Sequence, residues 1–276
     1  MDDLTALEII NLLNIGLSSY NFKSHVASDI PSEALYVDSS NLKTQDYLHE
    51  MDRWSKDHQM IISKKKTKAI MFNYTHNYQI GTRITLEGEN IEFVDKIKLL
   101  GTWVSNKLTW NENCTYLIQK VNKRMQLLRR ILSFGASKDE MVHFWIIFCR
   151  SVLEQSCVVW HNSLTQENID DLERLQKTFT KLILKQEYES YEKALLKLNL
   201  DTLENRREEI SKKFAKNGIQ FNTLKDLLRK KKENVNFREA KVQEMYHVQF
   251  ANTERLKKSA IINLQNLLNK ETTRKS

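Results

Sequence analysis

Proline and glycine are scarce in this chain of 276 residues, which contains one Pro and six Gly. Because Pro breaks helices and Gly is needed mainly at turns and caps, so few of either predict a helix-rich fold. Cysteine is also scarce: Cys114, Cys149 and Cys157 are an odd number without C-x-x-C spacing. We therefore expect reduced, mostly buried thiols of an intracellular protein, and neither a disulfide framework nor a zinc site.

Several signatures of function are missing as well. The seven His form no H-x-E, H-x-D or H-E-x-x-H pattern, which disfavours zinc hydrolases and iron dioxygenases. No G-x-S-x-G, G-x-G-x-x-G or Walker sequence supports a serine hydrolase, a dinucleotide site or a nucleoside triphosphatase. The chain opens with two acids and has no apolar run of membrane-spanning length. We expect a nuclear or cytoplasmic protein with no membrane contact.

Positive charge is concentrated near the C-terminus. The formal net charge is +8, and residues 218–276 hold 13 Lys and Arg against 6 Asp and Glu, so the first 217 residues carry only about +1. A basic tail on a nearly neutral body is a common layout for binding a polyanion, although solubility alone also explains it. Charge by itself therefore does not distinguish nucleic-acid binding from solubility.

The hydrophobic pattern predicts mixed helix and strand in the first part of the chain and helix in the rest. Around the turn residue Gly88, alternating apolar residues predict a hairpin over 84–93. The stretch 98–132 starts as an apolar strand broken by Gly101, passes through a polar turn and becomes a helix with an apolar stripe. Ser137 with Glu140 is a capping box before a helix that is apolar nearly all round, which should be buried. Further helices are predicted over 4–13, 42–58, from Thr165 through Leu182, and from Asp201 to about Lys216.

Two groups of residues are candidates for chemistry or binding. Adjacent aspartates such as Asp2 and Asp3 can hold Mg²⁺ at a two-metal site, but at a chain start they more often serve as solvated charge or helix N-terminal partners. Basic side chains that could contact phosphates lie in a cluster before an apolar strand and on the predicted helix of 98–132: Lys65, Lys66, Lys68, Lys120, Lys123, Arg124, Arg129 and Arg130. A solvated loop is an equal alternative for the first three. Trp103 and Trp110 could stack on a base, although core packing is more frequent.

Taken together, these segments resemble the C-terminal half of the reverse transcriptase of non-LTR retrotransposons, the LINE and Jockey-like transposable elements. Residues 1–4 (MDDL) look like the end of the aromatic-x-Asp-Asp catalytic motif, and 65–72 resemble the next palm segment. Residues 98–104 (KLLGTWV) are similar to the primer-grip strand. Residues 108–130 resemble the start of the thumb, and residues 150–160 and 172–177 resemble its later helices.

The resemblance implies an α+β, mostly helical fold in three parts. These are a partial palm with a short antiparallel sheet over 1–98, a primer-grip strand and helical thumb over 99–217, and a basic helical tail over 218–276. It implies RNA or DNA of the primer-template type as partner, with Leu100, Gly101 and Trp103 joining the basic side chains at the interface. Asp2 and Asp3 would be a vestigial metal pair, and Mg²⁺ would bind only at a completed site.

The resemblance also implies a limit. The fingers, the first palm aspartate motif and any endonuclease domain would lie before Met1, so we expect a truncated protein that binds nucleic acid at most and is inactive alone. The first alternative is part of an active RNA-directed DNA polymerase completed by upstream sequence. The second is a segment similar to the N-terminal extension of AlkB-type tRNA-modifying dioxygenase or methyltransferase proteins, and the third is a helical protein-interaction module.

Overall fold

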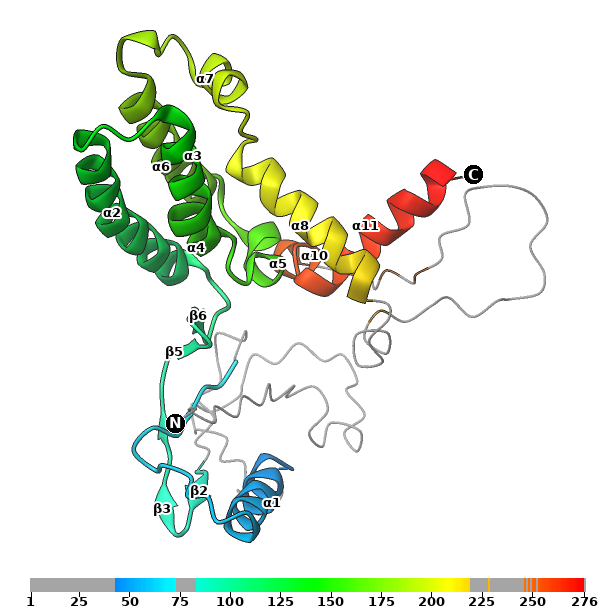
Figure 1. The fold of residues 1–276 in the computed structure, drawn as a ribbon. Helices are drawn as coiled ribbons and strands as arrows, with labels where there is room; N and C mark the ends of the chain where they lie inside the picture. The colour runs from blue at the N-terminus through cyan, green and yellow to red at the C-terminus, as the bar shows by residue number, and fades with distance from the viewer. Residues whose placement is uncertain are drawn as a thin grey trace, which may run out of the picture. The chain divides into compact units, whose positions relative to one another are not determined.

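The computed structural model describes residues 43–72, 83–218 and 253–275, together with residues 228, 246, 248, 250 and 251. The chain divides into two compact units, Met1–Thr109 and Trp110–Ser276 (Figure 1). The described part is mostly helical with a few short strands, in agreement with the α+β class expected from the sequence. The predicted helix over 4–13 lies outside the described residues.

The first unit consists of one helix and three small two-stranded sheets. Helix α1 (Lys43–Asp57) matches the predicted helix over 42–58 within one residue at each end. The Gln45 side chain joins it to the strands, because its amide accepts from the Thr85 N–H at 2.9 Å and donates to the Thr85 carbonyl at 2.8 Å. The strands are β1 (Lys68–Ala69), β2 (Thr85–Leu86), β3 (Glu89–Asn90), β4 (Glu92–Phe93), β5 (Lys96–Leu99) and β6 (Thr102–Ser105).

Two of these strand pairs are antiparallel hairpins. The predicted hairpin around Gly88 is confirmed as β2–β3, and both turn residues, Glu87 and Gly88, have positive φ, as a tight two-residue turn requires. The strand predicted to be broken by Gly101 does break there, but the two pieces pair with each other, which the sequence pattern did not indicate. Leu100 and Gly101 also have positive φ, and the chain reverses there to form the β5–β6 hairpin. The third pair, β1 with β4, is parallel, which the sequence pattern did not indicate.

The second unit is helical. Its longest element, α2 (Asn111–Ser133), confirms the helix predicted in the stretch 98–132 and buries one face through Cys114, Leu117, Val121, Met125 and Leu128. The remaining elements are α3 (Lys138–Phe144), the π-helical η4 (Trp145–Arg150), α4 (Ser151–Glu154), α5 (Cys157–Trp160), η5 (His161–Ser163), α6 (Gln166–Leu184), η6 (Lys185–Glu187), α7 (Tyr191–Leu198), α8 (Leu203–Gly218), α10 (Glu254–Lys257) and α11 (Ala260–Lys275).

The helix predicted after Ser137 begins as expected but is not continuous. Both bonds of the capping box are present, since Ser137 accepts from the Glu140 N–H and the Glu140 carboxylate accepts from the Ser137 N–H. The helix then widens into the π turn η4 and breaks at Ser156, whose φ of 52° is left-handed. A segment that is apolar nearly all round gives no sign of such a shift in register, because either register buries an apolar face.

The core of the second unit lies where α2, the α3–η4–α4 segment and α6 meet (Figure 1). The rings of Trp145 and Phe179 stack there with centroids 4.4 Å apart, and both side chains are fully buried. The sequence prediction of buried thiols is confirmed, because Cys114, Cys149 and Cys157 are all buried and free. Burial raises the pKa of each of these thiols to about 11.

The C-terminal helix α11 packs against α8 and α5 (Figure 1). The contact is apolar, with a cluster formed by Ala215, Leu228, Tyr246, Leu264 and Leu268. The backbone of Tyr246 is fixed by the Asn269 side chain, which accepts at 2.9 Å and donates at 3.0 Å. The basic run 229–232 lies outside the described residues.

No single helix in the described ranges is long and apolar enough to cross a membrane. One bent pair of helical segments, Lys138–Glu154 and Cys157–Ser163, is long and apolar enough only when the two are taken together.

Candidate nucleic-acid interface

The predicted metal pair cannot be placed, because Asp2 and Asp3 lie outside the described residues. Among the residues that the structure does describe, no group of His, Cys, Asp or Glu side chains is arranged to hold a metal ion. The candidate interface therefore consists of basic and aromatic side chains.

The basic cluster of the first unit is partly paired with acids. Lys64 forms ion pairs with Glu87 at 3.1 Å and with Glu89 at 2.9 Å, and Lys68 pairs closely with Glu92. Hydrogen bonds that the Lys64 ammonium donates to Glu89 and Glu87 raise the pKa of Lys64. Lys65 and Lys66 are exposed on the turn before β1. A phosphate that contacted Lys68 would have to displace Glu92, so the pairing lowers the positive charge that this cluster offers.

The three residues predicted at the primer grip share one hairpin. Leu100 and Gly101 form the turn between β5 and β6, and Leu100 is 79% exposed. Trp103 lies on β6, opposite Lys98 in the strand register, and is partly buried. Trp110, the other aromatic residue singled out in the sequence, is buried at the start of the second unit, so it belongs to the core.

The basic side chains of α2 lie on more than one side of the helix. Lys120 and Arg129 are nine positions apart, which at about 100° per residue places them on opposite sides. Lys123 and Arg130 are exposed, whereas Lys120 and Arg124 are partly buried beside the α4 segment. The basic side chains predicted on this helix therefore do not form a single face, because they are spread over its exposed surface.

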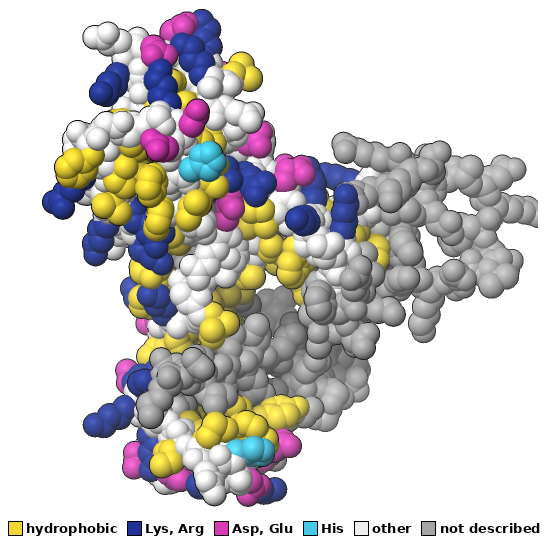
Figure 2. All heavy atoms as spheres, in the orientation of Figure 1, with side chains coloured by type: hydrophobic (Ala, Val, Ile, Leu, Met, Phe, Trp, Pro, Cys, Tyr) yellow, Lys and Arg dark blue, Asp and Glu magenta, His cyan; other side chains and the backbone are white. Residues whose placement is uncertain are grey.

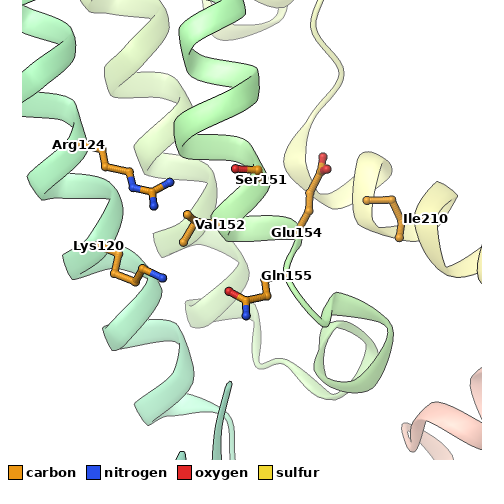
Figure 3. A pocket seen from close by; sticks show the side chains of 7 residues that line it. All are labelled: Lys120, Arg124, Ser151, Val152, Glu154, Gln155 and Ile210. Atoms are coloured by element: carbon orange, nitrogen blue, oxygen red, sulfur yellow. The ribbon is translucent and has the colours of Figure 1, made fainter. Parts of the chain in front are cut away.

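Lys120 and Arg124 line an open pocket of about 510 Å³ in the second unit. Figure 3 shows their side chains pointing from α2 toward α4. The rest of the lining comes from the end of the interrupted helix and from α8: Ser151, Val152, Glu154, Gln155 and Ile210. Sequence reasoning found the two basic residues and missed the other five, which lie far from α2 in the chain.

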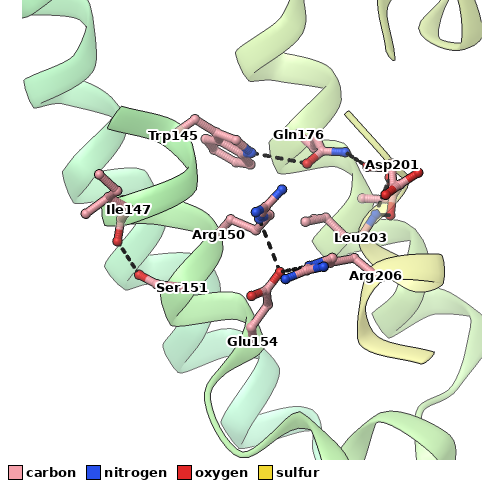
Figure 4. A network of polar contacts seen from close by, with 10 residues as sticks. Trp145, Ile147, Arg150, Ser151, Glu154, Gln176, Asp201, Leu203 and Arg206 are labelled. Atoms are coloured by element: carbon pink, nitrogen blue, oxygen red, sulfur yellow. Dashed lines mark hydrogen bonds and ion pairs between the residues drawn. The ribbon is translucent and has the colours of Figure 1, made fainter. Parts of the chain in front are cut away.

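The π turn η4 fixes two of the pocket's polar side chains. The Arg124 guanidinium donates through Nη1 to the carbonyl of Phe148. The Ser151 hydroxyl donates to the carbonyl of Ile147 (Figure 4). Both acceptors lie within the π segment Trp145–Arg150. The carbonyl groups of this irregular turn thus hold the Arg124 guanidinium and the Ser151 hydroxyl at the pocket wall.

A carboxylate between two arginines forms the end of the pocket. Oε1 of Glu154 pairs with Nε of Arg150 at 3.2 Å and with Nε of Arg206 at 3.1 Å (Figure 4). Burial lowers the pKa of Arg150, and Arg206 lowers it further, while Glu154 and Asp201 oppose this change. The i,i+4 spacing of Arg150 and Glu154 was visible in the sequence, but the third partner comes from α8 and was not.

Exposed apolar side chains lie beside the basic ones. Figure 2 shows hydrophobic side chains gathered on one face of the second unit, with Lys and Arg around them. Ile147 is 60% exposed and Phe148 is 42% exposed, and the Phe148 ring stacks on Phe144 with centroids 5.6 Å apart. The candidate surface is therefore mixed in character, with charge on α2 and apolar area on η4.

Comparison of this chain with models of protein families, with curated proteins and with solved structures finds no match in any of the three.

Proposed function

We propose that this chain is a reverse-transcriptase-like protein that binds RNA or DNA through a helical thumb and has no polymerase activity on its own. The proposal rests on the resemblance of residues 98–177 to the primer grip and thumb. It is supported by the order of the elements, in which the β5–β6 hairpin leads within a few residues into a 23-residue helix with one buried face.

The observation that carries the proposal is the charge of α2. The helix contains five Lys and Arg and a single acid, Glu112. None of the ion pairs found among the described residues includes a side chain of α2, whereas basic residues on α3, α7 and α10 pair with glutamates. A long helix that keeps its basic side chains out of ion pairs suits the phosphates of a nucleic-acid backbone, which are bound mainly by charge and with little sequence preference.

The salt dependence of binding tests the proposal. The triple variant Lys123→Gln/Arg129→Gln/Arg130→Gln removes three exposed charges from α2. If all three contact phosphates, the slope of log affinity against log salt should fall in magnitude by about 2 to 3. The measurement is filter binding or fluorescence anisotropy with a single-stranded RNA and a primer-template duplex over a range of salt concentrations.

A matched control changes the same net charge elsewhere. In Lys138→Gln/Lys193→Gln/Lys197→Gln, each lysine removed already pairs with a glutamate on η6 or beside α7. This control should keep the wild-type slope. Equal slopes for both triple variants, or no affinity of the wild type at low salt, would contradict the proposal. The latter result would favour the helical interaction module, for which Ile147 and Phe148 are candidate surface residues.

The proposal assigns binding, and not polymerisation, to this chain alone. Purified protein should therefore fail to extend a primed RNA template with Mg²⁺ and deoxynucleotides. This part of the proposal would be overturned if the wild-type protein extended the primer and Asp2→Ala abolished the extension. That result would show that the Asp2–Asp3 pair works in a complete two-metal site.

A further inference from the structure

We propose that the pocket between α2, α4 and α8 binds a phosphate group of a nucleic-acid backbone, held by Lys120 and Arg124. This inference rests on the proposed function and assigns one defined contact to it. The pocket differs from the exposed surface of α2 because its lining comes from three separate elements, which meet only in the folded second unit (Figure 3).

The pocket offers cationic donors from two adjacent turns of one helix. Lys120 and Arg124 are four positions apart, so their side chains lie on the same side of α2. The Lys120 ammonium lies over the Tyr116 ring at 5.2 Å from its centroid, a contact that leaves its N–H groups able to donate. Arg124 uses Nη1 for the Phe148 carbonyl, and its guanidinium carries further N–H groups. An ammonium beside a guanidinium is a typical arrangement for binding a phosphate.

The single acid of the lining does not cancel this charge. Glu154 is neutralised by Arg150 and Arg206, which both form ion pairs with its Oε1. Lys120, Arg124 and these two arginines are positively charged, whereas Glu154 and the nearby Asp201 are negatively charged. The net charge around the pocket is therefore positive. A cationic ligand would meet repulsion there, whereas an anion would not.

The Arg124 side chain is already held in place before any ligand binds. Its guanidinium is anchored by a carbonyl of the π turn, so less conformational entropy is lost when it bonds to a phosphate. Ser151 uses its proton for the Ile147 carbonyl, and it therefore acts as part of the pocket wall. π turns are rare and often occur at functional sites, which agrees with a binding role for this part of η4 and α4.

The size and the apolar part of the lining fit a nucleotide unit better than an isolated ion. The volume of about 510 Å³ lies within the range of about 300–1,000 Å³ that is usual for small-molecule sites. Val152 and Ile210 provide apolar wall against which a sugar can pack. A backbone phosphate at Lys120 and Arg124, with its sugar against these side chains, would use both kinds of lining.

The experiment is a titration of ¹⁵N-labelled full chain with a short single-stranded RNA and, separately, with inorganic phosphate. RNA should shift the backbone amides of Ser151, Val152 and Gln155, and Lys120→Gln should weaken RNA binding by about three- to tenfold, as expected for one partly exposed charged contact. The control Lys213→Gln removes the same charge from an exposed position of α8 outside the pocket and should bind as the wild type. Circular dichroism checks that both variants are folded.

The outcomes separate this inference from the proposed function. If RNA binds but leaves the pocket amides unshifted and binds Lys120→Gln as tightly as the wild type, the inference is overturned and the function stands. If RNA does not bind but inorganic phosphate shifts the pocket amides, and does so less in Lys120→Gln, the function fails and the pocket binds free phosphate. If neither probe shifts these amides, the pocket does not bind phosphate.

Discussion

The indole Nε1 of Trp145 donates a hydrogen bond to Oε1 of Gln176 at 3.1 Å, and both side chains are fully buried. Because the indole N–H can only donate, the bond fixes the orientation of the Gln176 amide. Its Nε2 then donates to the Asp201 carbonyl at 2.8 Å (Figure 4). The same Nε2 donates to the Tyr191 hydroxyl at 3.0 Å. One side chain thus joins η4, α6, α7 and the residues just before α8.

Gln176→Met should destabilise the protein by about 2–4 kcal/mol, since it removes three hydrogen bonds and leaves the Trp145 N–H and the Asp201 carbonyl without this partner in the core. The free energy of unfolding in urea, followed by tryptophan fluorescence, measures the change. The control is Gln166→Met, an exposed position in the first turn of the same helix, where the effect should stay within about 0.5 kcal/mol. Equal effects at the two positions would contradict a central role for Gln176.

Part of this arrangement could be predicted from the sequence. Gln176 follows Leu172 by four positions and precedes Phe179 by three, so the period of α6 already places it on the buried face. Helix starts were also predictable, because Ser137 and Thr165 cap α3 and α6 as their sequence pattern indicated. The partners of Gln176 were not predictable, since they lie 15 to 31 positions away along the chain.

The same limit applies to the candidate interface. The four-residue spacing of Lys120 and Arg124 indicates a shared side of α2, but nothing in the sequence places Ser151 or Ile210 beside them. That placement follows from the π turn and from the break at Ser156, which change the direction of a segment whose uniform apolar character predicts a straight helix. The β5–β6 reversal was missed because Leu100, at a positive φ, is an unusual residue for a tight turn.

The three cysteines should resist thiol reagents in the native state. All are buried, and burial raises the pKa of each to about 11, which makes the reactive thiolate rare at pH 8. Thr115→Cys places an exposed thiol next to buried Cys114 and serves as a reference. With Ellman's reagent, the variant should release about one equivalent rapidly, and the wild type should react at least about 100-fold more slowly until denatured. Rapid reaction of a wild-type cysteine would show that the α2–α4 core opens readily.

His161 makes stability depend on pH through Arg207. Nε of the buried Arg207 donates to Nδ1 of His161 at 3.2 Å, and the guanidinium lies over the Trp160 ring. Burial, followed by the charge of Arg207, lowers the pKa of His161 to about 4, while Glu208 opposes the change. Protonation of His161 would turn Nδ1 from an acceptor into an N–H donor. That donor would face the N–H group and the positive charge of Arg207.

Because the pKa of His161 in the folded state is below its value of about 6.5 in the unfolded chain, the unfolded chain binds more protons between these values. Stability should therefore be independent of His161 above about pH 6.5 and fall as the pH drops toward 4, by about 2 kcal/mol at pH 5. His161→Gln retains an acceptor for Arg207 and does not titrate, so its free energy of unfolding should lose this part of the pH dependence. His143→Gln, at an exposed position of α3, should follow the wild-type curve. Parallel curves for the wild type and His161→Gln from pH 7.5 to 5 would show that the His161 proton is not linked to folding.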